Sequence, residues 1–124
     1  MRSALHPIVD HEPGRVLSKA AYRAAAALGL SQRELAETIG VSAASASRMR
    51  DGGFALSGKP FELAACLVRV FRSLDAVAGG DPVTLKSWMA AANSDLNGVP
   101  KQLVQTAPGL IDVLNYLDAQ RAPV

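Results

Sequence analysis

Apolar residues recur at helical spacing along most of the chain. They lie three and four positions apart, the period at which side chains share one face of an α-helix. No stretch alternates apolar and polar residues for long enough to indicate a β-strand. The sequence therefore predicts an all-α protein. Glycine, proline and asparagine separate the expected helices, which are residues 18–28, two short helices within 31–52, 60–78, 82–93, 100–106 and a last helix from 108.

Residues 31–52 have the pattern of two short helices joined by a tight turn. Ser31 and Glu34 have the spacing of a capping box, in which each residue bonds the other's backbone N–H. Gly40 allows the sharp turn, and Ser42 can cap the second helix. The expected buried positions are Leu35, Ala36, Ile39, Ala46 and Met49. The caps, turn and apolar spacing together predict a helix-turn-helix.

Short and basic side chains occupy the outer face of the second helix of this pair. Such residues let a helix lie close in the major groove of DNA. Ala43 and Ala44 offer only methyl groups, for example to thymine, so direct reading of bases rests on few side chains. The predicted DNA contacts are Gln32, Arg33, Ser42, Ala43, Ala44, Ser45, Ser47, Arg48 and Arg50.

The expected helix 60–78 is apolar on two sides. One row consists of Phe61, Ala64, Ala65, Val68 and Phe71, and the other of Leu63, Leu67, Val70 and Leu74. A narrow polar stripe is left, made of Glu62, Arg69, Arg72 and Ser73. Two apolar faces need two partners. We expect one row to close the helix-turn-helix unit and the other to support the C-terminal segment or a second copy of the chain.

The segments on either side of these helices are interpreted in the same way. Residues 1–14 are expected to form a flexible arm, and helix 18–28 can turn inward either Tyr22, Ala25 and Ala26 or Ala21, Ala24 and Leu28. Trp88 is expected to anchor the C-terminal core with Leu85, Met89 and Ala92. Asn97-Gly98 marks a turn. In the last helix, the inward positions are Leu110, Val113, Leu114 and Leu117.

Charge divides the chain into unlike parts. The formal net charge is only +2, but residues 15–50 hold six basic and two acidic side chains. From Gly79 onward there are three basic and four acidic side chains. A phosphate-binding surface is therefore expected in the front half.

Several function classes are disfavoured by the sequence. It has no carboxylate pair, Cys–His set, glycine-rich phosphate loop or metal-ligand spacing, so we predict a non-enzyme without cofactor or metal. Cys66 is expected to be a buried small hydrophobe, and His6 and His11 lack further ligands. No apolar run is long enough to cross a membrane or to act as a signal peptide, so a cytoplasmic protein without membrane partner is expected.

Two stretches resemble known families. The first resembles the Xre/Cro-type repressor motif through Ser31, Gln32, Gly40, Val41, Ser42, Ser47, Arg48 and Gly52. The second has the order W-x4-N-x2-L-x-G-x-P followed by LVQTAPGLIDVLNYL, here Trp88, Asn93, Leu96, Gly98 and Pro100. It resembles the toxin-binding domain of MbcA/ParS/Xre antitoxins, over about residues 59–124.

The resemblance implies a domain order and a function. It implies an Xre/Cro-like unit at residues 15–58, joined by the long helix to a small toxin-binding domain at 59–124. The chain then resembles a type II antitoxin encoded beside a RES-domain toxin that consumes NAD or transfers ADP-ribose. Expected partners are that toxin and operator DNA, in a homodimer or a higher hetero-oligomer with the toxin. The residues expected to contact the toxin are Asn115, Asp118, Gln120, Arg121 and Val124.

Two other functions stay open on the sequence. One is a stand-alone phage-type repressor whose C-terminal helices serve only for dimerisation. The other is a toxin-binding protein in which the helix-turn-helix no longer binds DNA. A neighbouring gene for a RES-type toxin distinguishes the first from an antitoxin, and promoter binding distinguishes the second.

Overall fold

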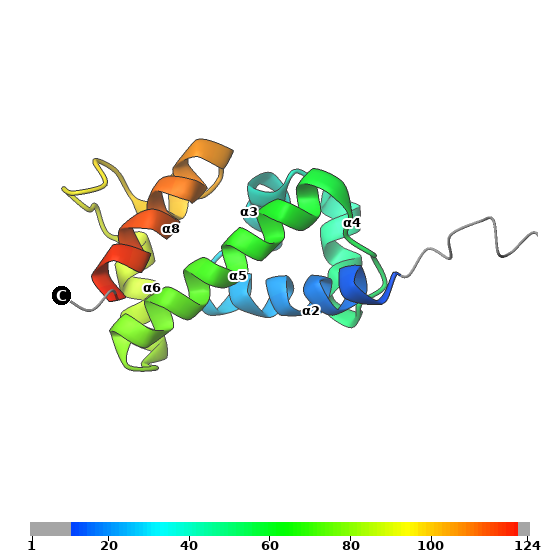
Figure 1. Ribbon diagram of the computed structural model, residues 1–124, viewed down its shortest axis with the longest axis horizontal. Coiled ribbons are helices and arrows are strands. Elements are labelled where there is room, and N and C mark those ends of the chain that lie inside the picture. The colour runs from blue at the N-terminus through cyan, green and yellow to red at the C-terminus, as the bar shows by residue number, and fades with distance from the viewer. Residues whose placement is uncertain (1–10, 122–124) are drawn as a thin grey trace, which may run out of the picture.

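The computed structural model describes residues 11–121 and consists of helices joined by short connections (Figure 1). Within these residues no strand is formed, and the only β-type pairing is an isolated bridge between Asn93 and Gly98. The predicted all-α class is confirmed. In chain order the helices are α2 (Glu12–Ala27), α3 (Gln32–Ile39), α4 (Ala43–Arg48), the 3₁₀ helix η1 (Met49–Asp51), α5 (Gly58–Ala78), α6 (Pro82–Ala90), α7 (Pro100–Leu103) and α8 (Ala107–Arg121).

Helix α5 is the central element of the molecule. Its N-terminal half lies among α2, α3 and α4, and its C-terminal half lies beside α6 and α8, as Figure 1 shows. Its most extensive contacts are with α8 and α2. Ala64 and Val68 of one predicted row are buried, and so are Leu67, Val70 and Leu74 of the other. The prediction that its two apolar faces need two partners is confirmed, and both partners belong to the same chain.

One continuous core joins the front and back halves. The largest fully buried side chains come from both, and they form a single cluster of contacting residues. A core packed at the density of protein interiors fixes the elements that contribute to it. The helix-turn-helix and the C-terminal segment are therefore positioned relative to each other. The largest side chains of this core are Leu28, Leu35, Ile39, Met49, Leu67, Leu74, Met89, Leu110 and Leu117.

Helix α2 begins earlier than the sequence predicted. It starts at Glu12, so residues 12–14 of the expected arm are helical. Pro13 lies in the first turn, where the missing N–H removes no helical hydrogen bond. Gly14 is buried, and its carbonyl accepts a hydrogen bond from the Leu56 N–H at 3.3 Å. This contact with the loop before α5 extends the helix; the rest of the predicted arm, residues 1–10, lies outside the described residues.

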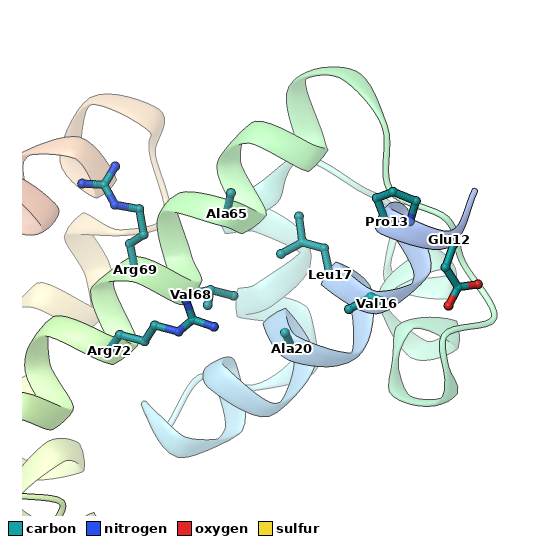
Figure 2. A pocket seen from close by; sticks show the side chains of 9 residues that line it. All are labelled: Glu12, Pro13, Val16, Leu17, Ala20, Ala65, Val68, Arg69 and Arg72. Carbon is teal, nitrogen blue, oxygen red and sulfur yellow. The ribbon is translucent and has the colours of Figure 1, made fainter. Parts of the chain in front are cut away.

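The inner face of α2 follows one of the two predicted arrangements. Ala21, Ala24 and Leu28 are buried, together with Ala25. A groove of about 550 Å³ opens beside this face, between α2 and α5 (Figure 2). Val16, 56% exposed, lies on its apolar wall. The α2 residues that line the groove lie between positions 12 and 20, so it follows the N-terminal half of that helix.

Helices α6 and α7 are shorter than predicted. Helix α6 ends at Ala90, because the chain turns back and Asn93 and Gly98 exchange backbone hydrogen bonds of 2.8 and 3.2 Å. Asn97 has φ 58°, which confirms the predicted turn. Helix α7 ends at Leu103 and not at Thr106.

The prediction that Leu85, Trp88, Met89 and Ala92 form one buried face of α6 is only partly correct. Leu85 and Met89 are buried, but Ala92 lies beyond the end of α6 and is exposed. Trp88 is half-buried and stacks on Tyr116 of α8, with ring centroids 6.3 Å apart. The tryptophan therefore joins α6 to α8 at the edge of the core.

Replacing Gly109 by alanine tests the tight turn between α7 and α8. An added Cβ would overlap the Leu103 carbonyl oxygen and lie 2.8 Å from its carbon. Because backbone atoms cannot move away independently, we expect Gly109→Ala to lower the free energy of unfolding by about 2–3 kcal/mol. Urea denaturation followed by circular dichroism measures the loss.

Gly98→Ala is the matched control. Its added Cβ meets only the flexible Leu103 side chain, at 3.2 Å. A smaller loss is expected there. Equal losses for the two variants would contradict the importance of the close backbone approach at Gly109.

Candidate functional site

The helix-turn-helix is fixed by the caps that the sequence predicted. The Ser31 hydroxyl accepts a hydrogen bond from the Glu34 N–H at 3.1 Å, and Glu34 Oε1 accepts one from the Ser31 N–H at 2.8 Å. Gly40 has φ 75°, in the left-handed region, where glycine is favoured. The Ser42 hydroxyl accepts from the Ser45 N–H at 3.0 Å. Both predicted caps and the glycine turn are confirmed.

The predicted outer face of α4 is exposed. Ala46 and Met49 point into the core and are completely buried. Ser45 is half-buried, and its hydroxyl is 3.0 Å from the Ser42 hydroxyl and 3.4 Å from Arg48 Nη2. Gln32 and Arg33 are exposed in the first turn of α3. The exposed residues of the predicted DNA face on α4 and its flanks are Ser42, Ala43, Ala44, Ser47, Arg48 and Arg50.

Two aromatic rings support the arginines of this face. The Arg48 guanidinium lies 5.4 Å from the ring centre of Phe54, and that of Arg50 lies 5.5 Å from the ring centre of Tyr22. Both distances are those of a cation–π contact. The Tyr22 hydroxyl also accepts hydrogen bonds from Arg50 Nη2 at 3.1 Å and Nε at 3.4 Å. These bonds raise the pKa of Arg50 above its usual value.

From the sequence, Tyr22 is expected only as a possible packing residue of helix α2. It is half-buried, and its hydroxyl donates to Gln32 Oε1 at 3.5 Å. The sequence does contain one signal for a second role, which is a phenol within a run of alanines. A side chain with a polar tip is unusual on a face that serves only for packing. Tyr22 brings together two predicted DNA contacts, Gln32 and Arg50, that are distant in sequence.

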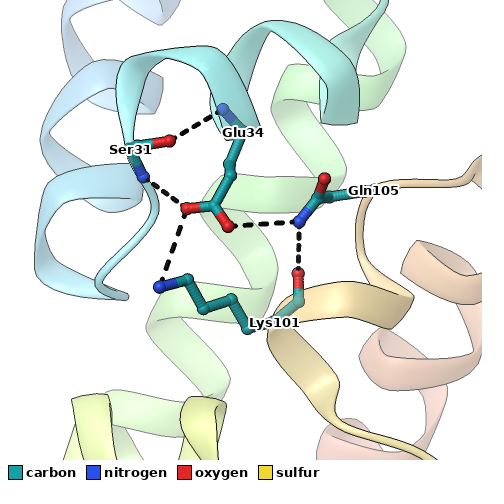
Figure 3. Close-up of polar contacts among 4 residues, drawn as sticks. All are labelled: Ser31, Glu34, Lys101 and Gln105. Atoms are coloured by element: carbon teal, nitrogen blue, oxygen red, sulfur yellow. Dashed lines mark hydrogen bonds and ion pairs between the residues drawn. The ribbon is translucent and has the colours of Figure 1, made fainter.

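A polar cluster links α3 to the C-terminal half (Figure 3). Glu34 Oε1 lies 3.7 Å from Lys101 Nζ, and Glu34 Oε2 accepts a hydrogen bond from Gln105 Nε2 at 3.4 Å. Gln105 Nε2 also donates to the Lys101 carbonyl at 3.1 Å. The carboxylate that caps α3 is therefore also the acceptor for the α7 region. The sequence did not predict this contact, because it joins residues 71 positions apart.

The pKa of Glu34 is lower than its usual value. The hydrogen bond from the Ser31 backbone N–H is the largest cause, and the Ser31 hydroxyl and the charge of Lys101 act in the same direction. Burial of the carboxyl opposes the shift. The ionised form of Glu34 is therefore favoured in the folded protein.

The expected toxin contacts on α8 fall into two groups. Asn115 and Gln120 are exposed. Asp118 binds α5 instead, through an ion pair of 3.0 Å with Arg69 Nη2 and a hydrogen bond of 2.8 Å from the Ser73 hydroxyl. These side chains therefore do not form one exposed flank.

The end of α8 is held to α5 by the same cluster. Arg121 Nη1 donates to the Ser73 hydroxyl at 3.0 Å. Ser73, which the sequence places on the narrow polar stripe of α5, is only 1% exposed. It is buried because Asp118 and Arg121 satisfy its hydroxyl. Val124, the last expected contact, lies outside the described residues.

Comparison with known families agrees with this two-part architecture. Residues 7–69, about half of the chain, match the model of the antitoxin Xre-like helix-turn-helix domain. Residues 73–122 match that of the antitoxin Xre/MbcA/ParS C-terminal toxin-binding domain. No curated protein matches the chain. Within the described residues, every helix is too short or too polar to span a membrane.

The class of protein follows from the fold and these matches. It is a helix-turn-helix protein with a second, toxin-binding unit packed on the same central helix. The chain belongs to the Xre/MbcA/ParS family of antitoxins. The first matched stretch ends at residue 69 and the second begins at residue 73. Both positions lie within α5, the helix that the two units share.

Glu34→Ala tests the link between the cap and the C-terminal half. The change removes the capping acceptor and the partner of Lys101 and Gln105. We expect a loss of about 1–2 kcal/mol in the free energy of unfolding at pH 7. The pKa of Glu34 is lower in the folded than in the unfolded state. The ionised side chain therefore contributes to the free energy of unfolding above the unfolded-state pKa, and this contribution disappears as pH falls through the folded-state pKa.

Thermal unfolding between pH 7 and pH 3, followed by circular dichroism, measures this dependence. The difference in Tm between wild type and Glu34→Ala should shrink as the pH falls below about 4.5. Glu37→Ala, on an exposed residue of the same helix, is the control and should have little effect. A difference that stays constant with pH would show that the charge of Glu34 does not contribute.

Proposed function

We propose that this antitoxin neutralises a RES-domain toxin through its C-terminal unit and represses its own operon through the helix-turn-helix. The observation that carries the proposal is the pairing of both family matches on one continuous core. The shared core supports a protein that can bind both partners in one arrangement. The RES assignment itself rests on the family resemblance, in which the toxin consumes NAD or transfers ADP-ribose. Such a protein acts in the cytoplasm, where operator DNA and NAD are present.

The DNA-binding part of the proposal is supported by the exposed face of α4. Ala43 and Ala44 at its start leave space for close approach to base edges. Ser47 and Arg48 are exposed beside them and can bond base edges or phosphates. Few side chains can read bases directly, so specificity is expected to depend on two copies bound to spaced half-sites.

The toxin-binding part of the proposal is supported by the free side of α8. Asn115 and Gln120 are exposed, and Ile111 is an exposed apolar residue on the same helix. A helix with exposed polar and apolar side chains can cover a cleft of a partner protein. Asp118 and Arg121 support this surface by holding α8 on α5.

A double variant on α8 tests neutralisation. Asn115→Arg with Gln120→Arg should weaken protection against the toxin encoded beside this gene, because two large charges would be desolvated at the interface without partners. We expect neutralisation to fall at least about ten-fold, measured by cellular NAD in strains that co-express the pair. Ala26→Arg, on an exposed residue of α2, is the control. Full protection by the double variant would place the interface elsewhere.

Arg48→Ala tests operator binding. Loss of one phosphate contact should weaken binding to a duplex from the protein's own promoter about ten-fold and reduce the slope of log K against log salt by about one. Fluorescence anisotropy at several salt concentrations measures both. Arg72→Ala removes the same charge from α5 and should leave binding unchanged. Unchanged affinity in Arg48→Ala would favour a toxin-binding protein whose helix-turn-helix does not bind DNA.

A further inference from the structure

Tyr22 connects two predicted DNA contacts that come from different helices. It lies on α2, whereas Gln32 is the first residue of α3 and Arg50 belongs to η1. Its hydroxyl is 3.5 Å from Gln32 Oε1 and 3.1 Å from Arg50 Nη2. One phenol oxygen therefore lies at the junction of three helices, at the edge of the helix-turn-helix.

The directions of these hydrogen bonds are fixed by chemistry. A guanidinium only donates, so the Tyr22 oxygen accepts from Arg50. The single phenol proton then goes to Gln32 Oε1, which is an acceptor. The bonds use the amide oxygen of Gln32 and Nε and Nη2 of Arg50. The amide NH₂ of Gln32 and Nη1 of Arg50 are left for a partner, and both are donors.

Two donors on side chains that share one hydroxyl partner, one of them charged, suit a phosphate group. Phosphate oxygens only accept hydrogen bonds, and bonds between charged partners are shorter and stronger than neutral ones. The Tyr22 ring also lies 5.5 Å below the guanidinium, which restricts its orientation. An arginine held in this way loses less conformational entropy on binding than a free one.

We propose that Tyr22 is a positioning residue for DNA binding, which holds Gln32 and Arg50 together as a clamp for one phosphate of the DNA backbone. Tyr22 itself contacts the two side chains and not the base edges, so its effect is on affinity and independent of sequence. The inference depends on the proposed operator binding and adds to it a role for α2, the helix that precedes the motif.

Tyr22→Phe isolates this role. The variant keeps the ring and removes the hydroxyl, so Arg50 and Gln32 lose their common partner. Binding of the full chain to a fluorescein-labelled duplex from its own promoter should weaken about three- to ten-fold. Tyr116→Phe is the matched control, because it removes a hydroxyl that bonds Asp95 on the far side of α5. It should bind DNA as wild type does.

A double-mutant cycle with Arg50→Ala separates positioning from a general loss of structure. If Tyr22 acts through Arg50, Tyr22→Phe should have little further effect in the Arg50→Ala background. Thermal unfolding of all variants, followed by circular dichroism, shows whether the fold is kept. An effect of Tyr22→Phe that is as large without Arg50 as with it would overturn the clamp.

The remaining outcomes distinguish this inference from the proposed function. If wild type binds the promoter and Arg48→Ala weakens it, but Tyr22→Phe binds as wild type, operator binding stands and the role of Tyr22 is wrong. If wild type does not bind promoter DNA, operator binding fails and the inference fails with it. An equal loss in Tyr116→Phe would also overturn the assignment, because that hydroxyl is remote from Arg50.

Discussion

The burial of α5 on two sides is the constraint on which the rest of the structure depends. Leu67, Val70 and Leu74 are excluded from water on this one helix, and each large apolar side chain buried in this way contributes about 1.5–3 kcal/mol. Because α2 and α8 each pack most extensively against α5, neither the helix-turn-helix nor the toxin-binding unit has a complete core without α5. Both halves of the antitoxin are therefore parts of one folding unit.

Polar contacts at the edge of this core set positions more than they supply stability. The ion pair between Glu34 and Lys101 is partly exposed, and such pairs contribute little by themselves. The position of this ion pair matters more than its energy. The same Glu34 carboxylate completes the capping box of α3 and accepts a hydrogen bond from Gln105. A change at α7 therefore has a direct physical route to the first helix of the helix-turn-helix.

The structure also separates side chains that are held from those that are free to bind. On α8, Asp118 and Arg121 are occupied by Arg69 and Ser73 of α5, while Asn115 and Gln120 face solvent. On the helix-turn-helix, the rings of Phe54 and Tyr22 hold the guanidiniums of two exposed arginines. Held groups keep an interface in shape, and free groups make the first contacts with a partner.

Local chemistry explains what the sequence by itself determined. The all-α class, the Ser31–Glu34 cap, the Gly40 turn and the inward Ala46 and Met49 follow from helical spacing and from caps that bond residues three positions away. The two apolar rows along α5 follow from helical spacing in the same way. These features were predicted correctly because the interactions that create them lie within one or two turns of the chain.

Only the tertiary structure decided the contacts between distant residues. The start of α2 at Glu12 depends on Gly14 meeting Leu56, and the burial of Ser73 depends on Asp118 and Arg121. The junction formed by Tyr22 needs η1 to return beside α2. From the sequence alone, a polar residue in a helix is expected to be exposed unless its hydrogen-bond partner is known. The packing of the helices sets that partner, and the spacing of residues along one helix carries no information about it.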